Sequence, residues 1–219
     1  MGIGKGGRSM KTPWMEMTLR DFQSALASSS PTPGGGTAAA ISLGQASALT
    51  VMVADLTIGK EKWEAGWDVA NKVVPIAIRI MTRSGDLADE DSDSFDAVMD
   101  SFRLPKESDE EKSSRRTAIR EATLKAAEVP FETATLALEL LELLPELAAK
   151  GNANAASDVG VAGLLASAAC KGALFNVDIN LDSIPEDMGI ELREKSPNIL
   201  EQSRDLSREV MSAVRARLS

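Results

Sequence analysis

The sequence predicts an all-α protein: a single-domain multi-helix bundle with kinked long helices. Apolar residues recur at spacings of three and four along most of the chain, which is the period of a helix with one buried face. No run alternates polar and apolar residues clearly enough to predict a strand, and "NVDINL", which comes nearest, is interpreted as the end of a helix. The 219 residues, of which 43% are hydrophobic, suffice for one sizeable core.

The first helix is predicted to begin after Thr18. The Thr18 hydroxyl suits an N-cap, Asp21 follows three residues later, and the next apolar residues share one face. The preceding residues contain bases but no long apolar run, so they do not resemble a secretion signal. We therefore expect residues 1–17 to be a disordered or expression-derived start, and residues 18–219 to form the single domain.

Two predicted helices, at about 37–57 and 153–175, are rich in Gly, Ala and Ser. Residues 36–54 carry no charge and approach the length of a membrane span, but 12 of these 19 residues are Gly, Ala, Ser or Thr. Such a segment is only weakly hydrophobic, so we predict a buried helix and no association with a membrane. Small side chains let helix backbones approach closely, and we expect this pair at the centre of the fold.

The remaining segments also have helical periodicity. One helix is predicted over 62–81, a turn over 84–86 with a second helix after it, a long helix over 108–150, and an amphipathic helix in the tail. Proline lacks a backbone N–H and clashes with the preceding helical turn, so it should kink or break these helices. The prolines concerned are Pro75, Pro130, Pro145 and Pro197.

Composition excludes several classes of function. The 33 acids outnumber the 24 bases and give a net charge of -9, which argues against nucleic-acid binding, since phosphates need a basic surface. The single cysteine, Cys170, excludes an internal disulfide and suits a reducing, cytoplasmic location; we interpret it as a core residue. The chain has no histidine, and its acidic run lacks the glycine and final glutamate of a calcium loop, so no metal site is expected.

The stretch "PTPGGGTAAA" raises a question of its own, because Gly34, Gly35 and Gly36 open directly into an uncharged helix. It is not a phosphate-binding loop, since no Gly-Lys-Ser/Thr follows, and it lacks the spacing of a dinucleotide fingerprint. A helix start presents unpaired N–H groups, and glycines let a flat or anionic ligand come close to them. We interpret the three glycines as a ligand-facing helix start; a plain helix start is the alternative.

Six short motifs, taken in order, resemble the cyclodeaminase/cyclohydrolase family of one-carbon folate enzymes. They are "P-x-P-G-G-G", "LTIGK", the acidic run before "FDAVM", "LPK", "SD-x-GVA" and "NV-x-IN". The likeness covers the chain from about Thr18 onward, and "SDEEKSSRRTAIREATLKAAEVP" is most similar to the stand-alone methenyltetrahydrofolate cyclohydrolases.

The resemblance implies an all-helical homodimer or larger assembly that acts on a tetrahydrofolate derivative without a metal or redox cofactor. The implied reaction is hydrolysis of 5,10-methenyltetrahydrofolate to 10-formyltetrahydrofolate. Two alternatives stay open: a formimidoyltetrahydrofolate cyclodeaminase that releases ammonia, and a non-catalytic helical protein that binds folate or acts as a scaffold. Asp55 and Trp63 keep the second alternative open, because family members often have Asn and Tyr there.

The chain has neither His nor Tyr, so carboxylates and lysines remain for proton transfer. Lys60 of "LTIGK" is the first candidate, with an exposed surface lysine as the alternative. Asp158 is the second, although a Ser-Asp pair before a helix is also typical of a cap. Asp91 is the third, because it matches the family pattern within an acidic run that otherwise reads as a solvated helix start.

Four further residues are candidates for substrate binding. Asp55 and Ser157 neighbour the catalytic candidates in their motifs. Asn176 and Asn180 are spaced by four, so they share a helix face and suit hydrogen bonds to the edge of a pterin, or else to the end of their own helix.

Overall fold

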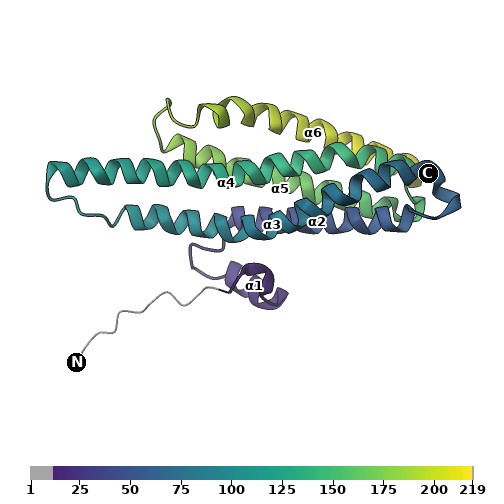
Figure 1. Cartoon of the computed structure of the whole chain (residues 1–219), viewed down its shortest axis with the longest axis horizontal. Helices are drawn as coiled ribbons and strands as arrows, with labels where there is room; N and C mark the ends of the chain where they lie inside the picture. The colour runs from purple at the N-terminus through teal and green to yellow at the C-terminus, as the bar shows by residue number, and fades with distance from the viewer. Residues whose placement is uncertain (1–11, 219) are drawn as a thin grey trace.

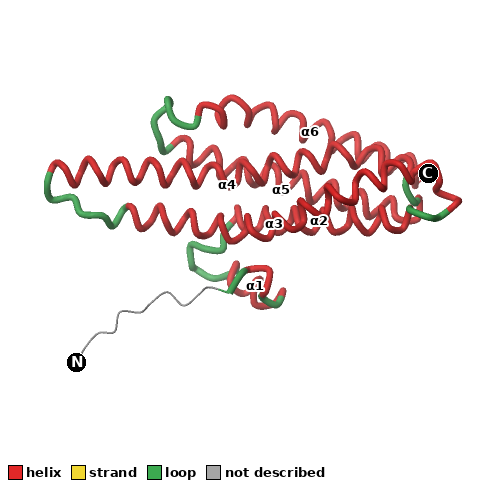
Figure 2. Tube along the Cα trace, in the orientation of Figure 1, coloured by secondary structure: helices red, strands yellow, loops and turns green. Residues whose placement is uncertain are grey.

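The computed structural model describes residues 12–218, and within this range it contains helices and no strand (Figures 1 and 2). The α-helices are α1 (Leu19–Leu26), α2 (Gly35–Thr57), α3 (Trp67–Ser101), α4 (Asp109–Lys150), α5 (Ala156–Asp182) and α6 (Ile190–Leu218). Three short 3₁₀ helices are η1 (Trp14–Glu16), η2 (Glu61–Gly66) and η3 (Ala153–Ala155). The prediction of an all-α fold is confirmed.

Helices α2, α3, α4 and α5 form the main bundle, each packing on the next and α5 returning to α2. Helix α6 covers α4 and α5, while α1 stands apart from the bundle on a loop (Figure 1). The small-residue helices α2 and α5 pack on each other as expected. Both are long and apolar enough to span a membrane by length and composition, yet 56% of the most apolar window of each is buried inside the bundle.

The predicted turn over 84–86 is wrong, because α3 runs without interruption from Trp67 to Ser101. Ser84 and Gly85 are small for another reason: Ser84 faces Gly44 of α2, and a Cβ added to Gly85 would lie 3.2 Å from Met15 Cγ. A Cβ added to Gly44 of α2 would lie 2.6 Å from the Ser84 hydroxyl, so the small residues let α2 and α3 approach closely. The same residue types serve turns and close helix contacts, and the sequence pattern does not separate the two.

The prolines, at which a kink or a break was predicted, do not break the described helices. Pro75 lies inside α3, Pro130 and Pro145 inside α4, and Pro197 inside α6, and each helix continues through them. The predicted Thr18 cap is confirmed, and Ser108, from which a long helix was predicted, also caps its helix. The Thr18 side chain accepts a hydrogen bond from the Asp21 N–H, and α4 begins with a capping box between Ser108 and Glu111.

Residues 1–11 of the expected disordered start lie outside the described residues, but the segment from residue 12 does not follow that expectation. The Trp14 N–H donates to Asp89 Oδ1 at 3.0 Å, and its indole N–H donates to Ser92 Oγ at 3.0 Å. The Trp14 ring also meets Phe22 edge-on, with 6.1 Å between ring centroids. Trp14 is partly buried, and its backbone N–H and indole N–H both donate to α3, so it holds this segment against that helix.

Candidate active site

A cavity of about 220 Å³ lies where α2 begins, and it collects most of the predicted binding residues. Its walls come from the turn before α2, from α3, from Ala126 of α4 and from α5. The predicted residues that line it are Gly34, Gly35, Gly36, Asp91, Asn176 and Asn180. Three separate stretches of the sequence thus meet at one site.

The glycines form the start of α2, with Gly34 as an N-cap that offers no side chain. A Cβ added to Gly36 would lie 2.1 Å from Asp91 Oδ1, so only bare backbone lets this carboxylate reach the helix start. A Cβ added to Gly35 would meet nothing within 4 Å, so Gly35 borders open space in the cavity. The structure thus gives the glycines both roles, a helix start and an open wall of the cavity.

Asp91 is a partly buried carboxylate placed against the N-terminal end of α2. Its Oδ2 accepts a hydrogen bond from the Thr37 hydroxyl at 2.9 Å, and the backbone N–H of Thr37 also donates to the carboxylate. Burial raises the pKa of Asp91 above its ordinary value, and the hydrogen bonds from Thr37 oppose this rise without cancelling it. The Asp91 carboxyl group therefore keeps its proton up to a higher pH than an exposed aspartate does.

Asn176 and Asn180 line the opposite wall of the cavity from α5. The Asn176 amide donates to the Gly172 carbonyl at 3.0 Å, and the Asn180 amide donates to the carbonyls of Ala126 and Asn176, both at 2.9 Å. These bonds use the NH₂ groups, while neither Oδ1 accepts a hydrogen bond from the described residues. Two amide oxygens thus remain as acceptors for a ligand.

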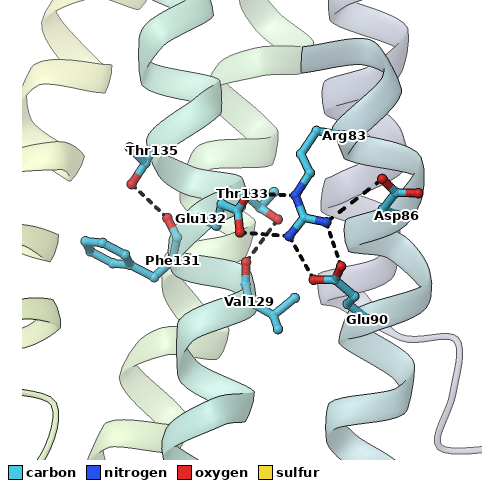
Figure 3. A network of polar contacts seen from close by, with 8 residues as sticks. All are labelled: Arg83, Asp86, Glu90, Val129, Phe131, Glu132, Thr133 and Thr135. Atoms are coloured by element: carbon cyan, nitrogen blue, oxygen red, sulfur yellow. Dashed lines mark hydrogen bonds and ion pairs between the residues drawn. The ribbon is translucent and has the colours of Figure 1, made fainter. Parts of the chain in front are cut away.

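The neighbouring acids of the "DEDSD" run have other partners. Asp89 accepts the Trp14 N–H, and Glu90 accepts two hydrogen bonds from Arg83, at 2.6 and 2.9 Å (Figure 3). Arg83 also donates twice to Glu132 of α4, at 2.7 and 2.9 Å, which lowers the pKa of Glu132. Arg83 therefore ties α3 to α4 while Asp91, one residue beyond Glu90, lines the cavity. No pattern in the sequence pointed to Arg83 or to its partner Glu132.

Sequence reasoning also missed Thr37, Ser94 and Phe95 at this site. Thr37 holds Asp91, while Ser94 and Phe95 line the cavity one helical turn beyond it. A signal existed for each of them, since Thr37 directly follows the glycines and the other two follow the acidic run.

The other four candidates lie at the opposite end of the bundle. Asp55 and Lys60 lie at the end of α2, whose 23 residues span about 35 Å. Ser157 and Asp158 lie in the first turn of α5, so neither is its N-cap, which is Ala155. Within one chain, Lys60 and Asp91 do not form one site.

The start of α5 and the end of α2 are joined by Asn152. Its N–H donates to Thr57 Oγ1 at 2.9 Å, and its side-chain amide donates to the Leu56 carbonyl at 3.0 Å. Trp63, which follows this end of α2, has Lys62 over its ring at 4.7 Å and Arg217 at 5.3 Å. Asp55, Lys60 and Asp158 thus lie near these two joined helix ends, away from the Asp91 cavity.

The raised pKa of Asp91 predicts a pH-dependent effect of Asp91→Asn on stability. The folded protein holds the Asp91 proton at a higher pH than the unfolded chain, so this group contributes most below the ordinary carboxyl pKa and loses that contribution as pH rises through the raised pKa. Denaturation between about pH 4 and pH 7 should show the unfolding free energy of Asp91→Asn improving relative to wild type as pH rises. Asp93→Asn, at an exposed position of α3, is the matched control. An identical pH dependence in both variants would contradict the assignment.

Comparison with known proteins identifies the family. The family model described as formiminotransferase-cyclodeaminase matches residues 18–196. A methenyltetrahydrofolate cyclohydrolase from Methylorubrum extorquens is 38% identical over 204 residues, covering 92% of this chain and 98% of that protein. The formimidoyltransferase-cyclodeaminase of Sus scrofa is 30% identical over 91% of this chain but only 37% of its own length.

A solved structure supports the same conclusion. The crystal structure of formiminotetrahydrofolate cyclodeaminase from Thermotoga maritima superposes with a TM-score of 0.79 at 28% identity, covering 94% of this chain and 99% of that one. The motifs quoted from the sequence thus coincide with a match over nearly the whole chain in sequence and in fold. The chain belongs to the formiminotransferase-cyclodeaminase family.

Proposed function

We propose that the chain hydrolyses 5,10-methenyltetrahydrofolate to 10-formyltetrahydrofolate. The observation that carries this proposal is the cavity in which the partly buried Asp91 carboxylate lies beside bare helix-start backbone and two amide oxygens. The 38% identity to a methenyltetrahydrofolate cyclohydrolase over nearly its whole length supports the same choice.

The groups of the cavity suit this substrate. The methenyl bridge is an amidinium-like cation, and a carboxylate such as Asp91 stabilises it and orients water toward its carbon. The free oxygens of Asn176 and Asn180 accept hydrogen bonds from the N–H groups of a pterin edge. Unpaired N–H groups at the start of α2 donate to its carbonyl. The substrate carbon is already electrophilic, so we propose that neither a metal nor a redox cofactor is used. We also propose that the enzyme is cytoplasmic.

We further propose that the working form is a homodimer, because one chain holds only one of the three predicted catalytic groups, Asp91, at this cavity. An isologous dimer repeats one surface about a two-fold axis. If that axis crosses the middle of the α2–α5 face, the Lys60 end of one chain meets the Asp91 end of the other. Lys60 and Asp158 of the second copy would then serve the cavity as the proton carrier and the second carboxylate.

The surface of α5 supports this pairing. Its exposed residues include a largely apolar stripe at helical spacing that no element of the described chain covers: Ser157, Val161, Leu164, Ala168, Phe175 and Ile179. Two exposed acids, Asp178 and Asp182, lie at the C-terminal end of this helix. An antiparallel pairing centred on Ala168 would place Leu164 opposite Gly172 and Val161 opposite Phe175. Larger side chains would thus meet smaller ones, as a self-complementary interface requires. Met52 and Leu56 extend the apolar surface onto α2.

A cyclodeaminase activity is the second candidate, because the Thermotoga maritima neighbour carries that name. Both reactions involve the same methenyl compound, so the cavity suits either. The non-catalytic alternative rests on Asp55 and Trp63. Neither residue lines the Asp91 cavity: Asp55 is exposed, and the Trp63 ring contacts the cations of Lys62 and Arg217.

The first test is turnover. Purified protein should accelerate the loss of methenyltetrahydrofolate absorbance above the buffer rate, and Asp91→Asn should lower turnover by at least about 10²-fold, the low end for one acid–base group. A parallel assay with formimidoyltetrahydrofolate and ammonia detection separates the two enzyme activities. Faster ammonia release would favour the cyclodeaminase, and folate binding without either turnover would overturn the proposed reaction.

The second test is the mass of the protein in solution. Light scattering at micromolar concentration should give twice the 23.2 kDa of one chain. Leu164→Glu should give the mass of one chain, because it would bury an unpaired charge at the centre of the apolar stripe. Ile190→Glu is the matched control, since Leu164 and Ile190 are both 54% exposed but Ile190 begins α6, away from the stripe. A wild-type monomer, or equal masses for both variants, would contradict the homodimer.

A further inference from the structure

A chain of hydrogen bonds leads from the N-terminal segment to the Asp91 carboxylate. The Trp14 indole N–H donates to Ser92 Oγ at 3.0 Å, and this oxygen lies 3.2 Å from Thr37 Oγ1. The Thr37 hydroxyl in turn donates to Asp91 Oδ2 at 2.9 Å. Thr37 is 0% and Ser92 is 2% exposed, so solvent does not compete for the bonds between the hydroxyls. The chain thus joins η1, α3 and α2 at the edge of the cavity.

Donor and acceptor chemistry fixes the direction of this chain. An indole N–H only donates, and an ionised carboxylate only accepts. The single hydroxyl proton of Thr37 is directed to Asp91, so the bond between the two hydroxyls uses the proton of Ser92. Ser92 is free to give this proton, because its oxygen accepts from Trp14 and its hydroxyl has no other acceptor among the described residues. All three protons therefore point toward Asp91.

Trp14 favours this direction over the reverse one. In the reverse arrangement Thr37 donates to Ser92, and Asp91 loses its hydroxyl donor. An oxygen that already accepts an indole N–H is a weaker acceptor for Thr37 and a stronger donor to it, because successive hydrogen bonds polarise one another. The buried Ser92 proton would also lose its partner, at the cost of an unsatisfied polar group. The indole thus strengthens the hydrogen bond that Asp91 receives without touching the carboxylate.

The surroundings of Asp91 leave this hydrogen bond as a strong influence on its charge. The walls that face it from α2, α4 and α5 are backbone, hydroxyl, alanine and amide groups, and none of the described residues there is charged. Glu90, its neighbour on α3, is bound by Arg83. Other acids of α3 and η1 raise the pKa of Asp89 rather than that of Asp91: Glu16, Asp86 and Asp93. The bonds from Thr37 therefore oppose the effect of burial on the pKa of Asp91 without help from a nearby cation.

We propose that Trp14 is a positioning residue for Asp91, acting through the two buried hydroxyls. The proposal rests on the proposed function, because it assumes that Asp91 meets the substrate cation as an ionised carboxylate. A carboxylate that receives the Thr37 hydrogen bond is fixed in orientation and stays ionised to a lower pH. The N-terminal segment is therefore part of the working site, although Trp14 itself does not line the cavity.

The first experiment measures the ionisation of Asp91 without substrate. Carbon-13 NMR of the side-chain carboxyl groups follows the titration, and Asp91→Asn assigns the signal. Trp14→Phe removes the indole N–H but keeps an aromatic ring beside Phe22 and the backbone N–H to Asp89. It should raise the pKa of Asp91 by about half a pH unit, which is less than the loss of a whole hydrogen bond. Ser92→Ala breaks the same chain at its centre and should raise this pKa at least as much.

A double variant and a control decide whether the effect follows the chain. Trp14→Phe/Ser92→Ala should raise the pKa of Asp91 no further than Ser92→Ala alone, since both changes cut one path. Ser47→Ala removes a buried hydroxyl of α2 that donates to the Leu43 carbonyl of its own helix, and it should leave the pKa of Asp91 unchanged. An unchanged pKa in both single variants would overturn the proposal. Additive effects in the double variant would also overturn it, because Trp14 would then act by another route.

Turnover provides a second readout. In Trp14→Phe the acidic limb of kcat/KM for methenyltetrahydrofolate should move to higher pH by the same amount, while the rate above that limb stays within about threefold of wild type. A weakened fold would instead lower the rate at every pH. Shifted NMR titrations without any turnover would support the hydrogen-bond chain and overturn the proposed reaction. Normal turnover with an unshifted Asp91 titration would overturn the role of Trp14 alone.

Discussion

The backbone of Gly36 lies against the carboxylate of Asp91, and the arrangement of the candidate site follows from this contact. A Cβ at residue 36 would occupy the place of the carboxylate oxygen, at 2.1 Å, so α2 and α3 meet here only through bare backbone. The contact lets Thr37 donate to Asp91 from its hydroxyl. It also buries the carboxylate, which raises its pKa and leaves a carboxyl group able to exchange a proton nearer neutrality. A side chain of any size at residue 36 would displace the group on which the proposed chemistry depends.

The other side of α3 holds this geometry in place. Arg83 is fixed between Glu132 of α4 and Glu90, which lies seven residues later on α3 and directly before Asp91 (Figure 3). These ion pairs set the rotation of α3 against α4. The N-terminal segment adds a third support, since Trp14 hydrogen-bonds to Asp89 and Ser92 on either side of the catalytic candidate. The residues beside Asp91 in the sequence therefore hold it in position. Asp89 and Ser92 bind the N-terminal segment, and Glu90 is linked to α4 through Arg83.

The sequence predicted the helices, the central pair and the residues around the Asp91 cavity, because these depend on local patterns and on motif order. Periodicity located α2 and α5, and the Thr18 and Ser108 caps mark helix starts. The turn at residues 84–86 was predicted wrongly, since Ser84 and Gly85 are small to allow contacts with Gly44 of α2 and with Met15 that no local pattern reveals. Lys60 and Asp91 were both chosen because their motifs match the family pattern, yet they lie at opposite ends of α2. Only the direction of the helices in space shows that one chain does not unite them.

This separation makes the shared site the central claim, and mixing two inactive variants tests it directly. Lys60→Met and Asp91→Asn should each be inactive alone. If Lys60 of one chain serves the cavity of the other, random reassortment makes half of the dimers mixed, and each mixed dimer has one intact site, so activity should return to about a quarter of wild type. Differently tagged chains confirm by mass that subunits have exchanged. Mixed dimers with no more turnover than the separate variants would show that the two residues do not share a site across the interface.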